Sequence, residues 1–237
     1  FKADHCFSSM PVKHLVQALP LDRTPKPIRE LALGLPYRDF MTVGVLVNRF
    51  NPSRYGSEAF KDNWIYIQEP DVKVCRLQIF NNWSPYMVEN PDHIWLGLEY
   101  MCQKSDEIWT MTDSEFIEFA VEELVKLDLV DRADILDACR FKLEKAYPSY
   151  SGSYAQFDQL KHFLNGIENL LCIGRNGQHR YNNQDHSMLT AIEAVRIVQR
   201  NVKDRSQLWN INTEASYHEE KTNENPSHPM NEKIKFA

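Results

Sequence analysis

Two neighbouring stretches near the carboxyl end of the sequence combine residue types that suit an electron-rich ligand. Asn169–Gly174 is a short apolar run that ends in glycine, and Gln184-Asp185-His186-Ser187 opens a helical pattern after the polar loop Asn176–Asn183. Open α/β sheets bind ligands where strands end and helices begin. The first backbone N–H groups of a helix are unpaired and partially positive, so they would suit a carbonyl oxygen or an anionic ring.

The side chains of this region allow two interpretations. Asp185 or Ser187 can cap the helix, although Asp185 could instead accept a hydrogen bond from a hydroxyl of a sugar-like ligand. The guanidinium of Arg175, at the strand end, suits phosphate or carboxylate, and the loop adds His179 and Arg180. A solvated basic loop is the alternative interpretation, because surface arginines are common.

This region resembles a known flavin motif. The runs Gly174-Arg175-Asn176-Gly177 and Arg180–Met188 resemble the carboxy-terminal flavin motif of the UDP-galactopyranose mutases, and they are similar to the wider FAD-dependent superfamily of amine oxidases and protoporphyrinogen oxidases. Ser8-Ser9-Met10-Pro11 is similar to the strand and turn by which that superfamily leaves its nucleotide-binding domain. The resemblance covers residues 1–200 and is most specific over Leu170–Ala194.

The resemblance implies roles for individual residues. The backbone of Asp185–Ser187 would meet the pyrimidine edge of the flavin, where the helix dipole favours negative charge. Arg175 matches the mutase arginine that reaches toward the diphosphate of the nucleotide sugar. Tyr147 and Tyr150 resemble tyrosines near the mutase substrate channel, although partly buried aromatics at a strand end would look the same. The implied cofactor-binding residues are Gly174, Asn183, Gln184, Asp185, His186 and Ser187, and the implied substrate-binding residues are Arg175, Arg180, Tyr147 and Tyr150.

Glycine is scarce in the sequence. Only eight glycines occur, and no G-x-G-x-x-G or Walker-type run is present, so the phosphate-cradling amino end of a Rossmann domain is missing. The start Phe1-Lys2-Ala3-Asp4 resembles neither a signal peptide nor an initiator methionine. We therefore expect a fragment of a longer FAD-dependent protein, with the amino-terminal FAD-binding half as its partner. We also expect that this chain alone does not retain FAD.

The order of apolar and polar segments predicts an α+β fold. A mostly antiparallel sheet with helices, the substrate domain, is bracketed by end pieces of an incomplete α/β FAD-binding domain of the Rossmann type. The expected division gives residues 1–20 to an opening strand and helix, 21–167 to the substrate domain, 168–203 to a closing strand, loop and helix, and 204–237 to a polar tail over the surface.

Periodicity also predicts the individual elements. Helices are expected at Val12–Leu19, from Pro27 to before Gly34, at Ser114–Leu127 with Thr112 or Asp113 as cap, at Ala155–Leu164, and at His186–Arg200 with an apolar face of Met188, Ile192 and Val195. Strands are expected at Lys2–Met10, Phe40–Phe50, Trp64–Gln68, Lys73–Phe80, Ile94–Cys102, Ile135–Ala146 and Asn169–Gly174. Glu99 is interpreted as part of a salt bridge on a strand face, with a carboxylate beside a substrate as the alternative.

Composition argues against several classes of protein. The net charge of -6 disfavours broad nucleic-acid binding, and no apolar run reaches the roughly 20 residues that span a bilayer. The five cysteines are widely spaced, and no pair has the spacing of zinc ligands. We expect buried reduced thiols, no metal site and a cytoplasmic location.

Three functions remain open at this point. The parent protein would be an FAD-dependent oxidoreductase that removes hydride from a carbon–nitrogen or carbon–carbon bond, or a mutase-like enzyme that isomerises a nucleotide sugar without net redox change. In both cases the flavin would do the chemistry on a small-molecule substrate, so no catalytic side chain is assigned. The third hypothesis is a non-catalytic substrate-domain fragment or interaction module.

Overall fold

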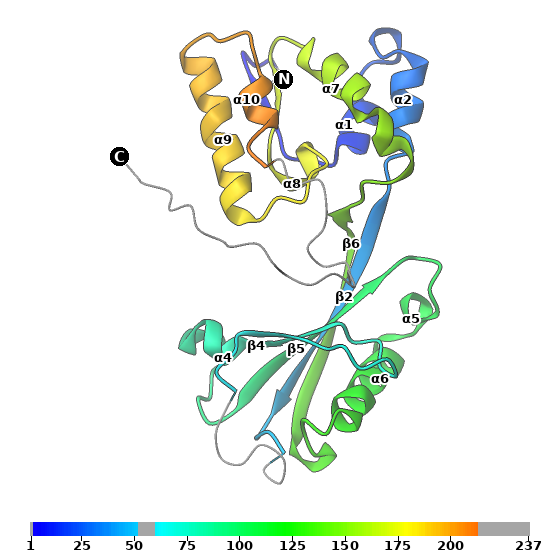
Figure 1. Ribbon diagram of the computed structural model, residues 1–237, viewed down its shortest axis with the longest axis vertical. Helices are drawn as coiled ribbons and strands as arrows, with labels where there is room; N and C mark the ends of the chain where they lie inside the picture. The colour runs from blue at the N-terminus through cyan, green and yellow to red at the C-terminus, as the bar shows by residue number, and fades with distance from the viewer. Residues whose placement is uncertain (1, 52–59, 213–237) are drawn as a thin grey trace, which may run out of the picture.

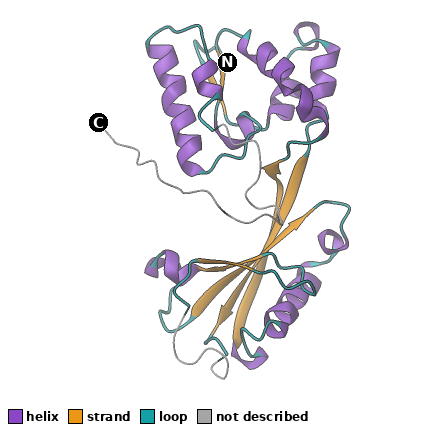
Figure 2. Cartoon of the chain, in the orientation of Figure 1, coloured by secondary structure: helices purple, strands orange, loops and turns teal. Residues whose placement is uncertain are grey.

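The computed structural model describes residues 2–51 and 60–212 as two units joined by a pair of long strands (Figure 1). One unit is built on a five-stranded antiparallel sheet, and the other on a two-stranded parallel sheet surrounded by helices (Figure 2). Each unit has its own hydrophobic core. The predicted α+β fold, a mostly antiparallel sheet bracketed by pieces of an α/β layer, is confirmed.

The larger sheet has the strand order β3-β4-β5-β2-β6, and every neighbouring pair is antiparallel. Val43, Val45 and Val47 alternate along one strand and are fully buried on one face, because successive side chains of a strand point to opposite faces. The strands are β2 (Tyr37–Val47), β3 (Trp64–Tyr66), β4 (Arg76–Ile79), β5 (Ile94–Cys102) and β6 (Ile135–Pro148).

One long helix, α6 (Asp113–Lys126), covers the buried face of this sheet (Figure 1). Phe116, Ala120 and Leu124 recur along one side of the helix and are fully buried in the core of the sheet unit. The shorter helices of this unit are α4 (Phe80–Trp83), α5 (Glu107–Thr110) and the 3-10 turns η2 (Pro85–Met87) and η3 (Arg132–Asp134).

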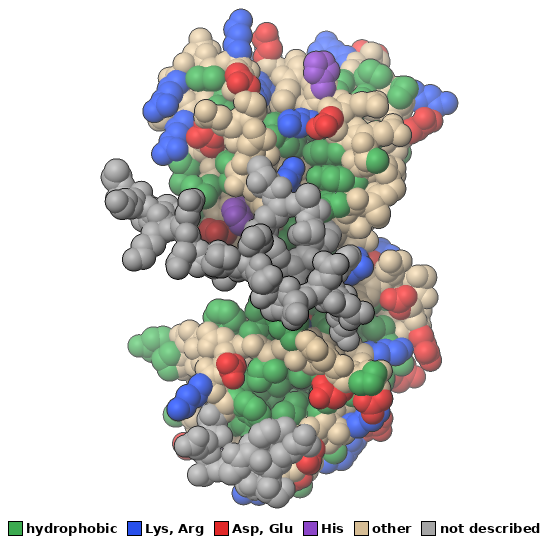
Figure 3. All heavy atoms as spheres, viewed as in Figure 1, with side chains coloured by type: hydrophobic (Ala, Val, Ile, Leu, Met, Phe, Trp, Pro, Cys, Tyr) green, Lys and Arg blue, Asp and Glu red, His purple; other side chains and the backbone are tan. Residues whose placement is uncertain are grey.

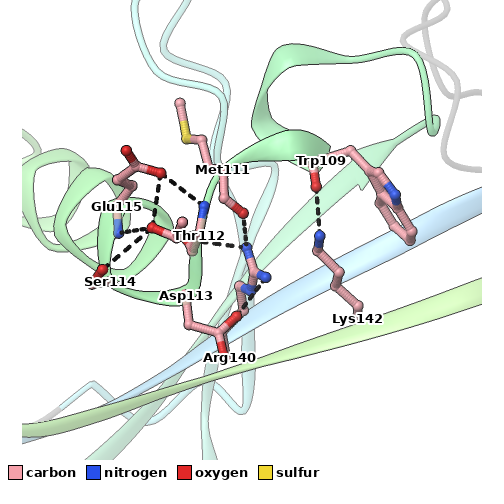
Figure 4. Close-up of polar contacts among 8 residues, drawn as sticks. All are labelled: Trp109, Met111, Thr112, Asp113, Ser114, Glu115, Arg140 and Lys142. Carbon is pink, nitrogen blue, oxygen red and sulfur yellow. Dashed lines mark hydrogen bonds and ion pairs between the residues drawn. The ribbon is translucent and has the colours of Figure 1, made fainter.

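Polar contacts fix the start of α6 on the sheet (Figure 4). Thr112 is the N-cap: its hydroxyl accepts a hydrogen bond from the Glu115 N–H, and the Glu115 carboxylate accepts one from the Thr112 N–H at 2.8 Å. Arg140 of β6 donates to the Met111 carbonyl at 2.9 Å and pairs with the Asp113 carboxylate at 2.5 Å. The cap of the helix and the edge strand of the sheet are therefore held together.

The smaller unit contains β1 (Cys6–Ser8) and β7 (Leu170–Cys172), which pair in parallel. Because both strands run the same way, their carboxyl ends, Ser8 and Cys172, lie at one edge of this small sheet. The surrounding helices are α1 (Val12–Ala18), η1 (Leu21–Arg23), α2 (Lys26–Leu33), η4 (Gly152–Gln156), α7 (Phe157–Asn165), α8 (Gly174–Gly177), α9 (Gln184–Gln199) and α10 (Ser206–Trp209).

The two hydrophobic cores divide the chain at other points than the predicted boundaries at residues 20, 167 and 203. α2 and α7 were expected in the substrate domain, but their apolar side chains pack in the core of the α/β unit, which includes Leu31 and Leu160. Residue 204 was expected to start a polar tail, but Leu208 and Trp209 of α10 are buried in the same core. Residues 213–237 of the predicted tail lie outside the described residues.

The apolar face predicted for the last long helix, α9, does not face the core. Met188, Ile192 and Val195 are 65%, 45% and 45% exposed, whereas the opposite side of the helix buries Thr190 and Ala194 completely. Sequence periodicity indicates an apolar stripe on a helix but does not indicate which surface covers it. In the part of the chain that the structure describes, α9 packs through its smaller side chains.

We expect Thr112→Ala to lower the free energy of unfolding by about 1 kcal/mol, because the variant loses the hydroxyl that caps the Glu115 N–H. Urea denaturation measures the change. Thr112→Ser keeps the hydroxyl and is the matched control, with an expected change of only a few tenths of a kcal/mol. Equal losses in both variants would show that the capping box does not stabilise α6.

Candidate functional site

The candidate site lies where β7 ends and α9 begins, with the short helix α8 between them. Gly174 follows β7 with a φ of +73°, a conformation that favours glycine. A side chain at Gly177 would collide with the carbonyl oxygen of Ser8, so α8 lies directly against the end of β1. The stretch Asn176–Asn183 was predicted as a loop, but its first residues belong to the short helix α8.

The amino terminus of α9 has no side-chain cap among the described residues. Its N-cap is Asn183, which makes no side-chain capping bond, so the prediction that Asp185 or Ser187 caps the helix is wrong. The helix begins at Gln184, which places Asp185 and Ser187 inside its first turn. The first N–H groups of this helix therefore remain available to a ligand, and the macrodipole favours a negative one.

A cavity of about 590 Å³ lies at this helix start. That volume is in the range of small-molecule sites, which is about 300–1,000 Å³. Its lining residues are Arg175, Asn182, Asn183, Gln184, Ser187 and Met188. Four of the predicted site residues thus meet at one cavity, whereas Gly174, Asp185, His186, Arg180, Tyr147 and Tyr150 are outside this lining set.

Arg175 reaches the cavity from a well-defined position. Its Nε donates to the Ala146 carbonyl at 2.9 Å, and its Nη1 donates to the Asn182 carbonyl at 3.2 Å. The guanidinium carbon lies 4.6 Å from the centre of the Tyr147 ring and 4.3 Å from that of Tyr181. Cation–π contacts of this kind hold an arginine in place without neutralising its charge.

Arg180 and Tyr150 brace the loop beside the cavity. The Arg180 guanidinium donates to the Asn212 carbonyl at 2.6 Å. The Tyr150 hydroxyl accepts a hydrogen bond from the Tyr181 N–H at 2.7 Å. The structure therefore gives both residues a supporting contact next to the site.

Four lining or supporting residues were not predicted as site residues from the sequence: Met188, which lines the cavity, and Tyr181, Asn182 and Gln178. Tyr181 stacks on Tyr147, with ring centres 5.5 Å apart, and Asn182 is only 2% exposed although it lies in a polar run. Gln178 is equally buried and donates to the carbonyls of Cys172 and Leu208. The available signal was the density of amide and aromatic side chains in this run, which suits a buried polar network.

Glu99 lies on the open face of the larger sheet. It pairs with Arg76 at 2.6 Å, and both side chains are only 3% exposed, so the predicted salt bridge on a strand face is confirmed. The Arg76 Nη2 also donates to the Tyr147 hydroxyl at 2.8 Å. The ion pair thereby reaches an aromatic ring that contacts Arg175.

The same open face carries exposed aromatic side chains. Trp64 and Tyr66 on β3 are 39% and 52% exposed, and Phe141 on β6 is 58% exposed. Figure 3 shows hydrophobic side chains along the surface of the sheet unit that faces the α/β unit. Apolar and aromatic side chains are typical of small-molecule sites, but these three are outside the lining of the cavity at the start of α9.

No group of three or more His, Cys, Asp or Glu side chains that could hold a metal ion occurs within residues 2–51 and 60–212. None of the helices in these ranges has the length and apolar character needed to cross a membrane. All five cysteines are free thiols, but only Cys102 and Cys172 are buried, whereas Cys6 is exposed.

Solved structures share this fold. A crystal structure of reduced UDP-galactopyranose mutase matches with a TM-score of 0.72 at 21% identity, over 89% of this chain and 44% of the other. A proposed protoporphyrinogen oxidase from Exiguobacterium sp. 255-15 matches with a TM-score of 0.57 at 14% identity, over 83% of this chain and 42% of the other. The PF1083 protein from Pyrococcus furiosus matches with a TM-score of 0.51 at 11% identity, over 88% and 43%.

These matches confirm the fold that the motif resemblance implies. The chain has the fold of one part of UDP-galactopyranose mutase and of protoporphyrinogen oxidase-like proteins. It spans less than half the length of the structures that it matches. No family model matches the sequence, and no curated protein matches it.

We expect the protein to lose stability on acidification because of His179, which supports the site loop. This side chain is fully buried, and burial lowers its pKa from 6.5 to about 4. Between pH 6.5 and about 4 the unfolded chain binds a proton at this histidine that the folded chain does not. The free energy of unfolding therefore decreases as the pH is lowered, by at most about 3 kcal/mol. The stability contributed by neutral His179 is thus present above pH 6.5 and is lost progressively as the pH falls from 6.5 to about 4.

Urea denaturation at about pH 7 and about pH 4.5 measures this loss in the protein and in His179→Asn. Asparagine tolerates the positive φ of 46° found at this position. The variant removes the titrating group, so its two free energies should differ by less. An equal pH dependence in both proteins would contradict the assignment to His179.

Proposed function

We propose that this chain is the substrate-domain and carboxy-terminal part of an FAD-dependent oxidoreductase of the amine oxidase-like superfamily. The observation that carries the proposal is the uncapped start of the 16-residue helix α9 at a cavity lined by Arg175, Asn183, Gln184 and Ser187. A helix start of this length with unpaired N–H groups suits the electron-rich edge of a flavin. The fold shared with the mutase and oxidase structures supports the same assignment.

The residues present fit one part of an FAD site. The backbone of Asp185–Ser187 would hold the pyrimidine edge, and Asn183 and Gln184 would lie beside the ring or the ribityl chain. Two buried polar atoms near the strand ends, the Ser8 hydroxyl and the Asn176 side-chain oxygen, have no hydrogen-bond partner among the described residues, which suits a ligand that supplies one. FAD would supply the hydride chemistry, while these residues orient it and favour negative charge on the ring.

The other part of the site would come from an amino-terminal FAD-binding half of the same protein. A two-stranded parallel sheet is unusual alone, because parallel sheets are normally covered on both faces. Beside it, α9 exposes the apolar side chains Met188, Leu189, Ile192 and Val195. Further strands and a covering layer would bury this face, and they would bring the glycine-rich phosphate loop that the sequence lacks.

A mutase-like enzyme that isomerises a nucleotide sugar is the second candidate, and Arg175 favours it. This cation lines the cavity while its two described hydrogen bonds go to carbonyls, so its charge is not neutralised there. An arginine so placed suits a diphosphate. Under both candidates we propose a cytoplasmic enzyme, for which the five free thiols are the support. A non-catalytic fragment is the third candidate.

An assay of the full-length protein separates these candidates. We expect a yellow protein with flavin absorbance, and we expect it to produce hydrogen peroxide from an amine or another reductant. Ring contraction of UDP-galactose by the reduced protein would instead support the mutase candidate. A full-length protein that stays colourless with added FAD would reject both enzymatic candidates.

We expect Ile192→Glu to abolish FAD retention by the full-length protein while it leaves the 237-residue chain stable. Ile192 is 45% exposed in this chain, so the free energy of unfolding should change by less than about 0.5 kcal/mol. In the full-length protein the new charge would be buried without a partner. Flavin absorbance after gel filtration measures retention.

Leu136→Glu is the matched control, because Leu136 is equally exposed but lies on β6 in the sheet unit. It should leave FAD retention unchanged. Full retention in Ile192→Glu would reject the proposal that this face of α9 meets the FAD-binding half.

A further inference from the structure

We propose that the buried ion pair between Arg76 and Glu99 is a positioning device for Arg175 and acts on it through Tyr147. It would make the cavity in the α/β unit depend on a charge pair in the sheet unit. The inference rests on the proposed function only where it gives Arg175 an anionic ligand. The positioning of Arg175 by the ion pair is supported by contacts within this chain alone.

The ion pair is fixed by burial and by strand register. Arg76 and Glu99 are direct partners on neighbouring strands β4 and β5, with Nε and Oε2 2.6 Å apart. The Gln78 amide donates to the other carboxylate oxygen. Two charges that are only 3% exposed persist only with well-placed partners, since an unpaired buried charge costs several kcal/mol. The Arg76 guanidinium therefore has one well-defined position.

Arg76 in turn holds the Tyr147 side chain in place. Its Nη2 donates to the Tyr147 hydroxyl at 2.8 Å, which makes the phenol an acceptor of a charge-assisted hydrogen bond. The guanidinium carbon also lies 4.6 Å from the centre of the Trp64 ring and 5.9 Å from that of Tyr147. A planar cation held between aromatic rings limits the rotation of both rings.

Tyr147 in turn sets the place of Arg175. Its ring is nearly parallel to that of Tyr181, at an interplanar angle of 19°, and the Arg175 guanidinium lies against both rings. The preceding residue, Ala146, supplies the carbonyl that accepts from the Arg175 Nε. Two consecutive residues at the end of β6 thus hold an arginine that belongs to the other unit.

This arrangement has a chemical consequence for the cavity. An arginine binds a phosphate or carboxylate best when its planar fork is already oriented, because little rotamer freedom is then lost on binding. Loss of the Arg76 bond to Tyr147 should loosen the Arg175 fork while every residue that lines the cavity stays in place. Affinity for an anion at this site would then fall roughly tenfold, the worth of one charge-assisted hydrogen bond.

The test uses the 237-residue chain with ¹⁵N in its arginine side chains. The Nε–H signal of Arg175, identified by its disappearance in Arg175→Lys, should be shifted by the ring currents of Tyr147 and Tyr181 and protected from exchange with water. Tyr147→Phe keeps the ring and removes the hydroxyl that accepts the hydrogen bond from Arg76. Tyr86→Phe deletes a hydroxyl from a side chain that is 95% exposed and is the matched control.

We expect the Arg175 signal of Tyr147→Phe to move toward the position of a solvent-exposed arginine and to exchange roughly tenfold faster, with no change in Tyr86→Phe. Glu99→Gln should move it in the same direction, because Arg76 loses its charged partner. An unchanged Arg175 signal in folded Tyr147→Phe would overturn the proposal and leave the ion pair as a contact that only stabilises the sheet unit.

A titration with inorganic pyrophosphate separates this inference from the proposed function. Binding that shifts the Arg175 signal, and that weakens roughly tenfold in Tyr147→Phe, supports both. If pyrophosphate does not move the Arg175 signal of the unchanged protein, the anionic ligand of Arg175 is rejected. The ring-current comparison still decides, in that case, whether Arg76 and Tyr147 position Arg175.

Discussion

The antiparallel pairing of β2 with β6 is the constraint on which both units depend. The two strands run side by side from the larger sheet into the α/β unit (Figure 1). Their ladder is irregular near its upper end, where the Asp39 carboxylate accepts the Lys145 N–H at 2.8 Å and Lys145 takes a φ of 56°. Such an irregularity bends a strand and re-aims the residues beyond it. Ala146 and Tyr147, which follow directly, are the two residues that meet Arg175.

The site therefore combines two kinds of order. Within the α/β unit, local sequence sets the start of α9, the position of Gly174 and the close packing of α8 on β1. Across the units, the position of Arg175 depends on strand pairing between residues about a hundred positions apart in the chain. The local geometry at Gly174 and the start of α9 survives changes in the rest of the protein. The position of Arg175, by contrast, is lost if the register of the sheet changes.

Much of the fold could be predicted from the sequence, because hydrophobic periodicity and the residues that begin or end helices and strands are local signals. β5 was predicted with its observed bounds, and the cap of α6 was predicted as Thr112 or Asp113, of which the structure shows Thr112. The contacts of Arg76 could not be predicted, since they join four strands that periodicity treats separately. The apolar stripe of α9 was predicted, but its exposure was not, because a sequence shows amphipathicity and not which surface meets which neighbour.

The two faces of α9 explain why the chain has the features of one part of a ligand-binding site. The buried face packs on the core of the α/β unit, and the Thr190 hydroxyl accepts the Gly174 N–H at 2.8 Å, which ties the helix to the end of β7. The opposite face exposes four large apolar side chains over about two turns. An uncapped amino terminus and an exposed apolar face are each costly in water, and both occur on this helix. Under the proposed function, a ligand at the first and a protein layer over the second would relieve both costs, so cofactor binding and assembly would be coupled through the same helix.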